Sequence, residues 1–344
     1  MKTILNNFLK FVIFSSIGGG ILYLIYRKQN SNYLEDCVSK GGLPEDCSLL
    51  DKLWVDLTTA HIEWIIVLVV LFLLSNVSRA LRWMMLLKGL GKKVRFANAF
   101  LAIMLNYFTN LGVPRIGEII RAGVITKYEG LPVEKVIGTV VVDRIVDVIS
   151  ILFAIFLAFV LEYDVIYGYI QENISDSPLM SNVMLAIGVS GLVLLILLWF
   201  FRNKIKATRF YDKIQNIVTG FVDGLKTIRS LENVNIFILH SVFIWLMYYF
   251  MTYFTFRAFD PTAHLGMSAA LIVFVFGGLG VVFPSPGGMG TYHAMVIAAL
   301  AIYGIGAEDA FSFANIVFFS LNLFCNISIG LLAVFLLPLI NRKH

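Results

Sequence analysis

The sequence predicts an all-α polytopic membrane protein with about six full spans and two re-entrant helical hairpins arranged as inverted-topology repeats. The chain of 344 residues is 59% hydrophobic and 14% charged, with a mean hydropathy of +0.84, whereas soluble domains contain about 25% charged residues. Two apolar regions also carry Gly/Pro breaks at their centres. A helix needs about 20 apolar residues to cross a bilayer. Apolar stretches of this length cover 5–26, 61–82, 136–161, 183–201, 236–259 and 313–338.

The chain begins with a helix followed by a loop. Residues 1–26 are interpreted as an uncleaved first helix, because two basic residues directly follow the apolar run and no small-x-small cleavage site is present. In residues 27–60, interpreted as an extracytoplasmic loop, Cys37 and Cys47 flank a short Gly/Pro segment. A loop outside the cytoplasm meets an oxidising environment, so these two cysteines are predicted to form a disulfide.

Lys and Arg residues are distributed unevenly between the loops. Residues 79–95 hold six and residues 202–229 hold seven, whereas residues 162–182 hold none. By the positive-inside rule, the first two segments are cytoplasmic. We therefore expect both termini in the cytoplasm, a cytoplasmic basic segment over 202–235, and a location in the bacterial cytoplasmic (inner) membrane.

Two apolar regions are too short on each side of their breaks to cross a bilayer. Residues 97–127 break at 112–114, and residues 267–303 break at 284–288. An arm of about 15 residues is about 22 Å long, short of the ~30 Å hydrocarbon core. Each region is therefore predicted to enter, turn and leave on one side, the alternative being two short tilted spans. Within a single transmembrane domain, 1–344, residues 61–161 (repeat A) and 236–338 (repeat B) would be inverted repeats, as is typical of transporters.

Charged residues gather at the first break. Arg115, Glu118 and Arg121 are spaced three apart, so they share one face of a helix that begins at Pro114. A charge at bilayer depth costs roughly 2.5–3.5 kcal/mol and is rarely accidental. A helix N-terminus and arginine forks suit a phosphate group; the alternative is a self-neutralising cluster at the cytoplasmic lip. The candidate substrate-binding residues here are Asn110, Pro114, Arg115, Gly117, Glu118 and Arg121.

The span that follows carries a second charged group. Asp143 and Asp147 lie one turn apart with Arg144 between them, and all three are candidate site residues. Since unpaired charges would be costly in the membrane, we predict an ion pair between this group and the arginines of the first break. Arg115 is expected to matter more than Arg121, because it follows the break directly and would lie farthest from bulk water. Pure helix–helix stabilisation is the alternative to a transport role.

The second break is the densest turn signal in the chain. Its glycines allow close backbone approach, and its N–H groups could cradle an anion. His293 could titrate near neutral pH, with a hydrogen-bonded structural role as the alternative. A polar stripe on the last span indicates interhelical hydrogen bonding or the wall of a polar cavity. The candidate residues of this half are Pro286, Gly287, Gly288, Gly290, His293, Asn315 and Asn322.

The sequence offers no sign of catalysis. No His/Cys/Asp cluster has metal-ligand spacing, and neither a P-loop nor a Gly-x-Ser-x-Gly motif occurs. We therefore expect no enzyme activity, no metal and no cofactor. The net charge of +5 comes from the membrane flanks, so nucleic acid is not an expected partner.

Several motifs keep a defined order along the chain. They are Arg79-Ala80-Leu81-Arg82-Trp83, Asn110 with Pro114-Arg115-Ile116-Gly117-Glu118-Ile119-Ile120-Arg121-Ala122, Glu129-Gly130-Leu131, Asp143-Arg144 and Pro284-Ser285-Pro286-Gly287-Gly288-Met289-Gly290. In these motifs the chain resembles the transmembrane domain of lysylphosphatidylglycerol synthases, a flippase-like family. The resemblance implies movement of a lipid between leaflets. No soluble aminoacyl-transferring domain accompanies it, which implies a stand-alone member, and His293 stands where relatives often carry an acidic residue.

The function expected from these features is translocation of an anionic or phosphate-bearing lipid between bilayer leaflets. Two opposed hairpins would close a polar cavity to one leaflet at a time. The alternatives are a secondary transporter of a small anion or metabolite, and a non-catalytic membrane scaffold for a partner enzyme. The expected partners are a phospholipid or polyprenyl-phosphate lipid, a lipid-modifying enzyme and a second copy of the chain.

Overall fold

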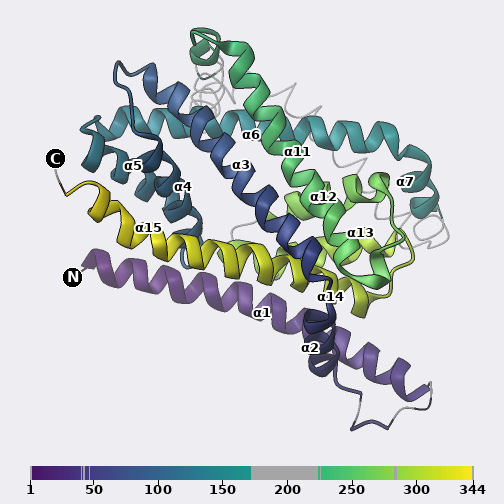
Figure 1. Cartoon of the computed structure of the whole chain (residues 1–344). Helices are drawn as coiled ribbons and strands as arrows, with labels where there is room; N and C mark the ends of the chain where they lie inside the picture. The colour runs from purple at the N-terminus through teal and green to yellow at the C-terminus, as the bar shows by residue number, and fades with distance from the viewer. Residues whose placement is uncertain are drawn as a thin grey trace, which may run out of the picture.

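The computed structural model describes residues 2–39, 41, 43–45, 47–171, 224, 226–282 and 285–342. The regular structure in these ranges is helical throughout (Figure 1), which confirms the all-helical prediction. The predicted span at 183–201 and most of the basic segment 202–235 lie outside the described residues.

Four helical segments of the described chain are long and apolar enough to cross a membrane. They correspond to four of the predicted spans, 61–82, 136–161, 236–259 and 313–338. The last one is continuous over 34 residues, because the π-helix η4 joins α14 to α15 without a break. The four segments are α3 (Ile62–Lys88), α6 (Val133–Leu161), α11 (Val234–Ala258), and the run α14 (Ala307–Val317), η4 (Phe318–Cys325) and α15 (Asn326–Ile340).

Each interrupted apolar region forms a pair of packed half-length helices. In the first region α4 (Phe96–Asn110) packs along α5 (Ile116–Glu129). In the second, α12 (Met267–Val282) packs along α13 (Thr291–Ala301), with the short 3-10 helix η3 (Pro286–Gly288) between them. Their 11 to 16 residues give about 16–24 Å per arm, less than the ~30 Å of a hydrocarbon core. Their re-entry into a membrane, and an inverted symmetry between the two halves, stay predictions.

The two hairpin tips lie against each other. A Cβ added to Gly287, in the second tip, would lie 2.8 Å from Cδ2 of Leu111 in the first. Around this contact α3 packs along α11, α15 along α4, and α12 against α6 (Figure 1). Two shorter elements, α7 (Tyr163–Ile170) and η2 (Asp260–Thr262), follow α6 and α11.

The first turn differs from the prediction that a helix begins at Pro114. Helix α5 begins at Ile116, and Arg115 precedes it in the left-handed conformation, with φ 66°. A side chain from the other arm stabilises this start, because the Gly117 N–H donates to Asn110 Oδ1 at 2.8 Å. A non-glycine residue in this conformation costs about 1–3 kcal/mol, so the turn depends on the packing of its two arms.

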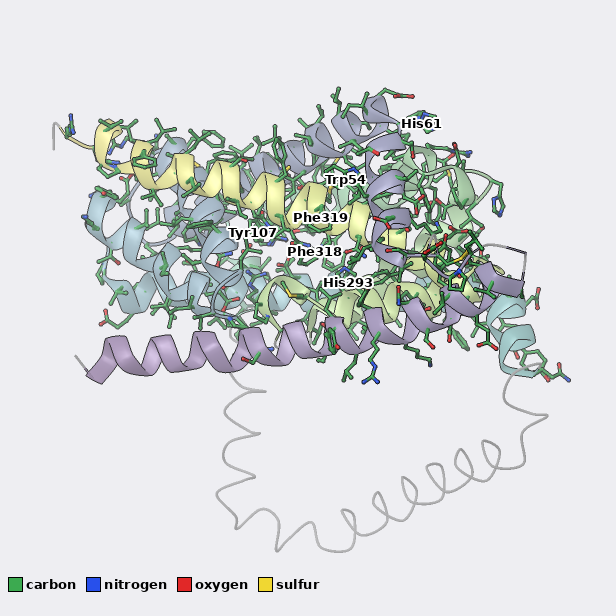
Figure 2. The ribbon with its side chains drawn as sticks, turned by 90° about the horizontal axis from the view of Figure 1, so that it is seen from below. Trp54, His61, Tyr107, His293, Phe318 and Phe319 are labelled. Carbon is green, nitrogen blue, oxygen red and sulfur yellow. A yellow bond between two sulfur atoms is a disulfide. The ribbon has the colours of Figure 1, made fainter. Side chains whose placement is uncertain are left out.

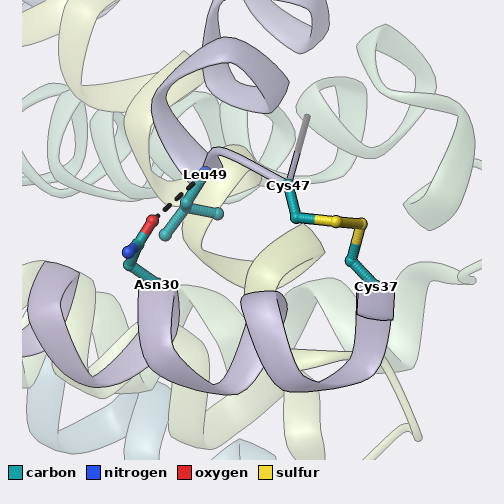
Figure 3. The surroundings of a disulfide bond; sticks show 4 residues. All are labelled: Asn30, Cys37, Cys47 and Leu49. Atoms are coloured by element: carbon teal, nitrogen blue, oxygen red, sulfur yellow. Dashed lines mark hydrogen bonds between the residues drawn. A yellow bond between two sulfur atoms is a disulfide. The ribbon is translucent and has the colours of Figure 1, made fainter. Parts of the chain in front are cut away.

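The N-terminal region is more helical than predicted. Helix α1 (Lys2–Ser39) continues beyond residue 26, and α2 (Leu49–Thr59) occupies part of the predicted loop. Cys37, near the end of α1, is joined to Cys47 by a disulfide with a Cα–Cα distance of 5.9 Å (Figure 3). The Leu49 N–H also donates to Asn30 Oδ1 at 3.2 Å (Figure 3).

Polar contacts hold α2 against the start of the last span. Lys52 Nζ forms an ion pair with Asp309 Oδ1 at 2.7 Å, and Ser312 Oγ donates to Asp56 Oδ2 at 2.5 Å. The disulfide and these contacts together fix α2 to two distant parts of the chain.

The disulfide can be tested by labelling thiols in intact cells. A membrane-impermeant maleimide should modify neither Cys37 nor Cys47 until a reductant is added, because both sulfurs are bonded. The variant Cys47→Ser should expose Cys37 to the reagent without reduction. Labelling of both cysteines in the unreduced wild-type protein would contradict the pairing.

A pair of glycines in α5 tests the packing of the first hairpin. A Cβ on Gly117 would lie 2.2 Å from the Asn106 carbonyl oxygen, whereas one on Gly123 would have nothing within 4 Å. Gly117→Ala should therefore lower the free energy of unfolding by about 1–3 kcal/mol through overpacking. Gly123→Ala should be neutral or stabilise by up to about 1 kcal/mol, since alanine favours helix. Thermal unfolding in detergent compares the two, and equal melting temperatures would refute the close contact.

Candidate functional site

A buried cluster of ion pairs joins α3 to α6. Arg82 Nη2 lies 2.6 Å from Asp143 Oδ1 and 2.8 Å from Asp147 Oδ1. Arg79 Nη1 lies 2.7 Å from Asp147 Oδ2. The two arginines are three residues apart on α3, and the two aspartates are four apart on α6, so each pair lies on one face of its helix. The basic face of α3 thus contacts the acidic face of α6 over about one helical turn.

Helix α5 contributes a third arginine to this cluster. Arg121 Nη2 lies 2.9 Å from Asp143 Oδ2. Its guanidinium also stacks over the ring of Trp83, 4.0 Å from the centroid, and Trp83 Nε1 donates to Thr139 Oγ1 at 3.0 Å. Because a planar guanidinium binds both carboxylates and aromatic faces, Arg121 fixes the second arm of the first hairpin to α3 and α6 together.

The remaining partners come from α4 and α11. Arg82 Nη1 donates to Ser241 Oγ at 3.2 Å, and Arg79 Nη2 donates to the Tyr248 hydroxyl at 3.2 Å. The hydroxyls of Tyr248 and Tyr107, the latter on α4, are 3.4 Å apart. One polar network therefore links five helices, α3, α4, α5, α6 and α11.

The edge of the cluster is accessible, in contrast to its centre. Arg144 Nε lies 2.7 Å from Glu118 Oε1, and these side chains are 35% and 34% exposed. Arg82 and Asp143 are 0% exposed. An ion or headgroup that approaches the cluster would therefore meet the Arg144–Glu118 pair first.

Basic groups outnumber acidic groups in the cluster. Four arginines (Arg79, Arg82, Arg121 and Arg144) face three carboxylates (Asp143, Asp147 and Glu118), which leaves one positive charge over. The Nε groups of Arg79 and Arg121 have no hydrogen-bond acceptor among the described residues. A buried surplus charge with unused donors is costly unless an anion joins it. The arrangement is thus suited to bind a negatively charged group.

The sequence pattern identified part of this cluster and missed its centre. Arg121–Asp143 and Glu118–Arg144 are ion pairs between the two charged groups, as expected. Arg79 and Arg82, which the sequence places both at the end of the span 61–82 and in the basic segment 79–95, are not loop residues. Helix α3 continues to Lys88, so both arginines lie inside the bundle. Their spacing of three residues at the end of an apolar helix was the signal available in the sequence.

The prediction that Arg115 lies farther from bulk water than Arg121 stays a prediction, but the arginine buried within the protein is Arg121 and not Arg115. Arg115 is exposed, because it precedes α5 in the turn. Arg121 is 0% exposed, because it lies more than a turn along α5 on the side that packs against α3 and α6. The hairpin tip is accordingly not the site of the buried arginine.

The candidate residues of the second hairpin form a separate group. Gly287, Gly288 and Gly290 all have positive φ values, between 58° and 81°, which explains the run of glycines in this turn. His293 is fully buried, and its ring lies 5.1 Å from that of Phe318 (Figure 2). Asn315 is near enough to interact with the imidazole, but neither ring nitrogen has a hydrogen bond of acceptable geometry within the described residues.

The polar stripe of the last span is satisfied mainly by local contacts. Asn315 Nδ2 donates to the Phe311 carbonyl at 2.8 Å, and Asn326 Nδ2 donates to Asn322 Oδ1 at 3.4 Å. Asn322 lies within the π-helix η4, an element often found at functional sites. These two bonds lie within one helix, whereas Ser312 of the same stripe donates to Asp56 of α2, which is a bond between helices.

The fold and the site define a helical membrane protein in which two half-length hairpins meet beside a buried arginine–carboxylate cluster. Residues 48–330 match the family described as the lysylphosphatidylglycerol synthase TM region, and the chain belongs to this family. The match begins at the start of α2 and includes both hairpins and the cluster. Helix α1 precedes it.

A curated relative is similar over part of the chain. This UPF0104 membrane protein from Methanocaldococcus jannaschii is 33% identical over 123 residues, which are 35% of this chain and 36% of the relative. The similarity thus spans about a third of the relative's length. No solved structure matches the chain.

Two arginines of the first hairpin provide a stability test of the cluster. Arg121→Gln should lower the free energy of unfolding by about 3 kcal/mol, because it breaks a buried ion pair. Arg115→Gln should change it by less than about 0.5 kcal/mol, since its side chain is exposed. Thermal unfolding of the two purified variants measures the difference. A larger loss for Arg115→Gln would contradict the arrangement described.

Proposed function

We propose that the protein translocates an anionic or phosphate-bearing lipid between bilayer leaflets, without chemical modification of the lipid. The observation that carries this proposal is the surplus positive charge of the buried cluster, beside a hairpin that is too short to cross a membrane. The family to which the chain belongs is linked to the handling of membrane lipids. Family membership therefore supports a membrane lipid as the substrate, and the charge of the site supports a negatively charged group on that lipid.

The path of the lipid headgroup across the membrane would run between the two hairpins. Their tips meet at Leu111 and Gly287, and Arg121 lies on the second arm of the first hairpin, about one and a half turns from its start. We propose that both hairpins are re-entrant and open to opposite sides. A small displacement of one tip from the other would then open the polar interior to one leaflet at a time, in the manner of transporters with inverted repeats.

A lipid headgroup would enter the cluster at its exposed edge, the Arg144–Glu118 ion pair. A lipid phosphate could replace Glu118 as the partner of Arg144, since both groups present oxygen atoms to the guanidinium fork. Arg144 keeps one carboxylate partner during the exchange, because Asp147 Oδ2 lies 3.2 Å from Arg144 Nη1, and the carboxylate that loses its partner, Glu118, is 34% exposed. A headgroup can therefore enter without exposing the buried aspartates.

The proposed orientation keeps both termini in the cytoplasm. With Arg79 and Arg82 removed from the count of six, four basic residues remain in the segment up to residue 95, namely Lys88, Lys92, Lys93 and Arg95. Residues 162–182 hold no Lys or Arg, so the positive-inside rule gives the same orientation with four basic residues as with six.

A second candidate function is transport of a small anion or metabolite through the same cluster. The positive surplus would attract an inorganic anion as well as a lipid phosphate. The two functions differ in the need for lateral access, because a lipid must keep its hydrocarbon chains in the bilayer while its headgroup crosses.

Reconstitution distinguishes these candidates. Purified protein in liposomes should accelerate exchange of fluorescent anionic phospholipids between leaflets, measured by dithionite quenching, and should leave the uptake of small anions unchanged. A panel of anionic, zwitterionic and polyprenyl-phosphate lipids then identifies the headgroup. If no lipid of the panel moves faster than in protein-free liposomes, the proposal fails.

Two substitutions of opposite sign test the role of charge. Arg144→Gln reduces the surplus of the cluster to zero, and Glu118→Gln raises it to two positive charges. Both remove the Arg144–Glu118 ion pair, and Arg144→Gln also removes the contact of Arg144 Nη1 with Asp147 Oδ2, so thermal unfolding of both variants measures their structural cost separately. Anionic-lipid exchange should fall about tenfold or more in Arg144→Gln and should be retained in Glu118→Gln. Equal losses in both variants would show that the ion pair itself, rather than the charge, is required.

A further inference from the structure

An open groove lies on the outer side of the first hairpin. It has a volume of about 290 Å³ and is lined by α4, α5 and α15. Pockets for drug-sized ligands begin at about this volume, so the groove has room for part of one hydrocarbon chain and not for a whole lipid. Its lining is apolar except for Lys127 and Tyr128, which line it towards the last turn of α5.

The walls of the groove include a glycine on α5 and a proline on α15. On α5 the lining residues follow the spacing of a single helical face, and at Gly123 this face has no side chain to fill the space. A Cβ at Gly123 would have nothing within 4 Å. On α15 the wall includes Pro338, which lies inside the helix. The lining residues from α5 are Ile120, Gly123, Val124, Lys127 and Tyr128.

The charged end distinguishes this groove from an ordinary depression in the lipid-facing surface. Lys127 is exposed, and its Nζ lies 5.0 Å from the ring centroid of Tyr128. Among the ion pairs of the described residues, none involves Lys127. Its position in the last turn of α5 places an ammonium beside an apolar channel, which matches a phosphate joined to a hydrocarbon chain.

We propose that this groove is a binding site for an anionic phospholipid, with one hydrocarbon chain between α5 and α15 and the phosphate at Lys127. The site is separate from the buried cluster, because α5 turns Arg121 towards α3 and α6 and turns Gly123 and Lys127 outward. The groove would bind this lipid whether or not the protein translocates lipids between leaflets. A lipid in this position supports the second arm of the first hairpin from the side opposite the ion cluster.

Photo-crosslinking in nanodiscs tests the chain position. The probe is phosphatidylglycerol with a diazirine in one hydrocarbon chain, and the labelled peptides are mapped by mass spectrometry. Labelling should concentrate on α5 and α15 in the wild-type protein and should fall at least fivefold in Gly123→Phe, which fills the groove. The matched control is Gly138→Phe on α6, another exposed helical glycine with nothing within 4 Å of a Cβ. Equal labelling of these peptides in both variants overturns the site.

The headgroup is tested by competition between phosphatidylglycerol and phosphatidylcholine for crosslinking at the groove. Lys127→Gln should reduce the preference for phosphatidylglycerol about fivefold, as expected for one basic residue near a lipid phosphate. Lys93→Gln, which removes an exposed lysine of a neighbouring loop, should not. An unchanged preference in Lys127→Gln refutes the assignment of the phosphate. These measurements need no transport, so the site and the translocation proposal can fail independently.

Discussion

The arrangement of the bundle depends on the ion pairs that Asp143 and Asp147 form with arginines of two other helices. Each aspartate alone would be costly inside an apolar bundle, and each arginine likewise. Their cost is offset only when α3, α5 and α6 come together with the correct rotation. The pairs therefore favour one register of these helices, because a shift would leave charged groups unpaired inside the bundle.

Close backbone contacts add the second constraint. In a membrane, lipid tails are as apolar as leucine, so helices associate through packing and polar contacts and not through the hydrophobic effect. Glycines supply such packing at three places. A Cβ would lie 2.2 Å from the Asn106 carbonyl oxygen at Gly117, 2.3 Å from Phe108 Cβ at Gly330, and 2.8 Å from the Thr291 carbonyl oxygen at Gly280. Both hairpins and the last span are thus held at distances that a larger residue would prevent.

Helix α1 is an addition to the part of the chain that matches the family. It nevertheless reaches the second hairpin, because a Cβ on Gly290 would lie 2.8 Å from Ile21 Cγ2. The Cys37–Cys47 disulfide ties the C-terminal end of α1 to the segment before α2, and α2 binds the start of the last span through Lys52 and Asp309. The added helix is therefore connected to the hairpin tip at one point and to the rim of the bundle at another.

The sequence by itself determined the helical membrane class, four of the long spans and the two interrupted hairpins. These follow from local properties, since hydropathy, segment length and Gly/Pro breaks act along the chain without reference to distant residues. The disposition of charge was decided by tertiary structure. Arg79 and Arg82 look like loop residues in the sequence, and only the partner carboxylates on α6 explain why α3 can carry them into the bundle. The sequence likewise does not show that Arg121 and not Arg115 is buried within the protein, because this depends on the contacts of Arg121 with Asp143 and Trp83 on two other helices.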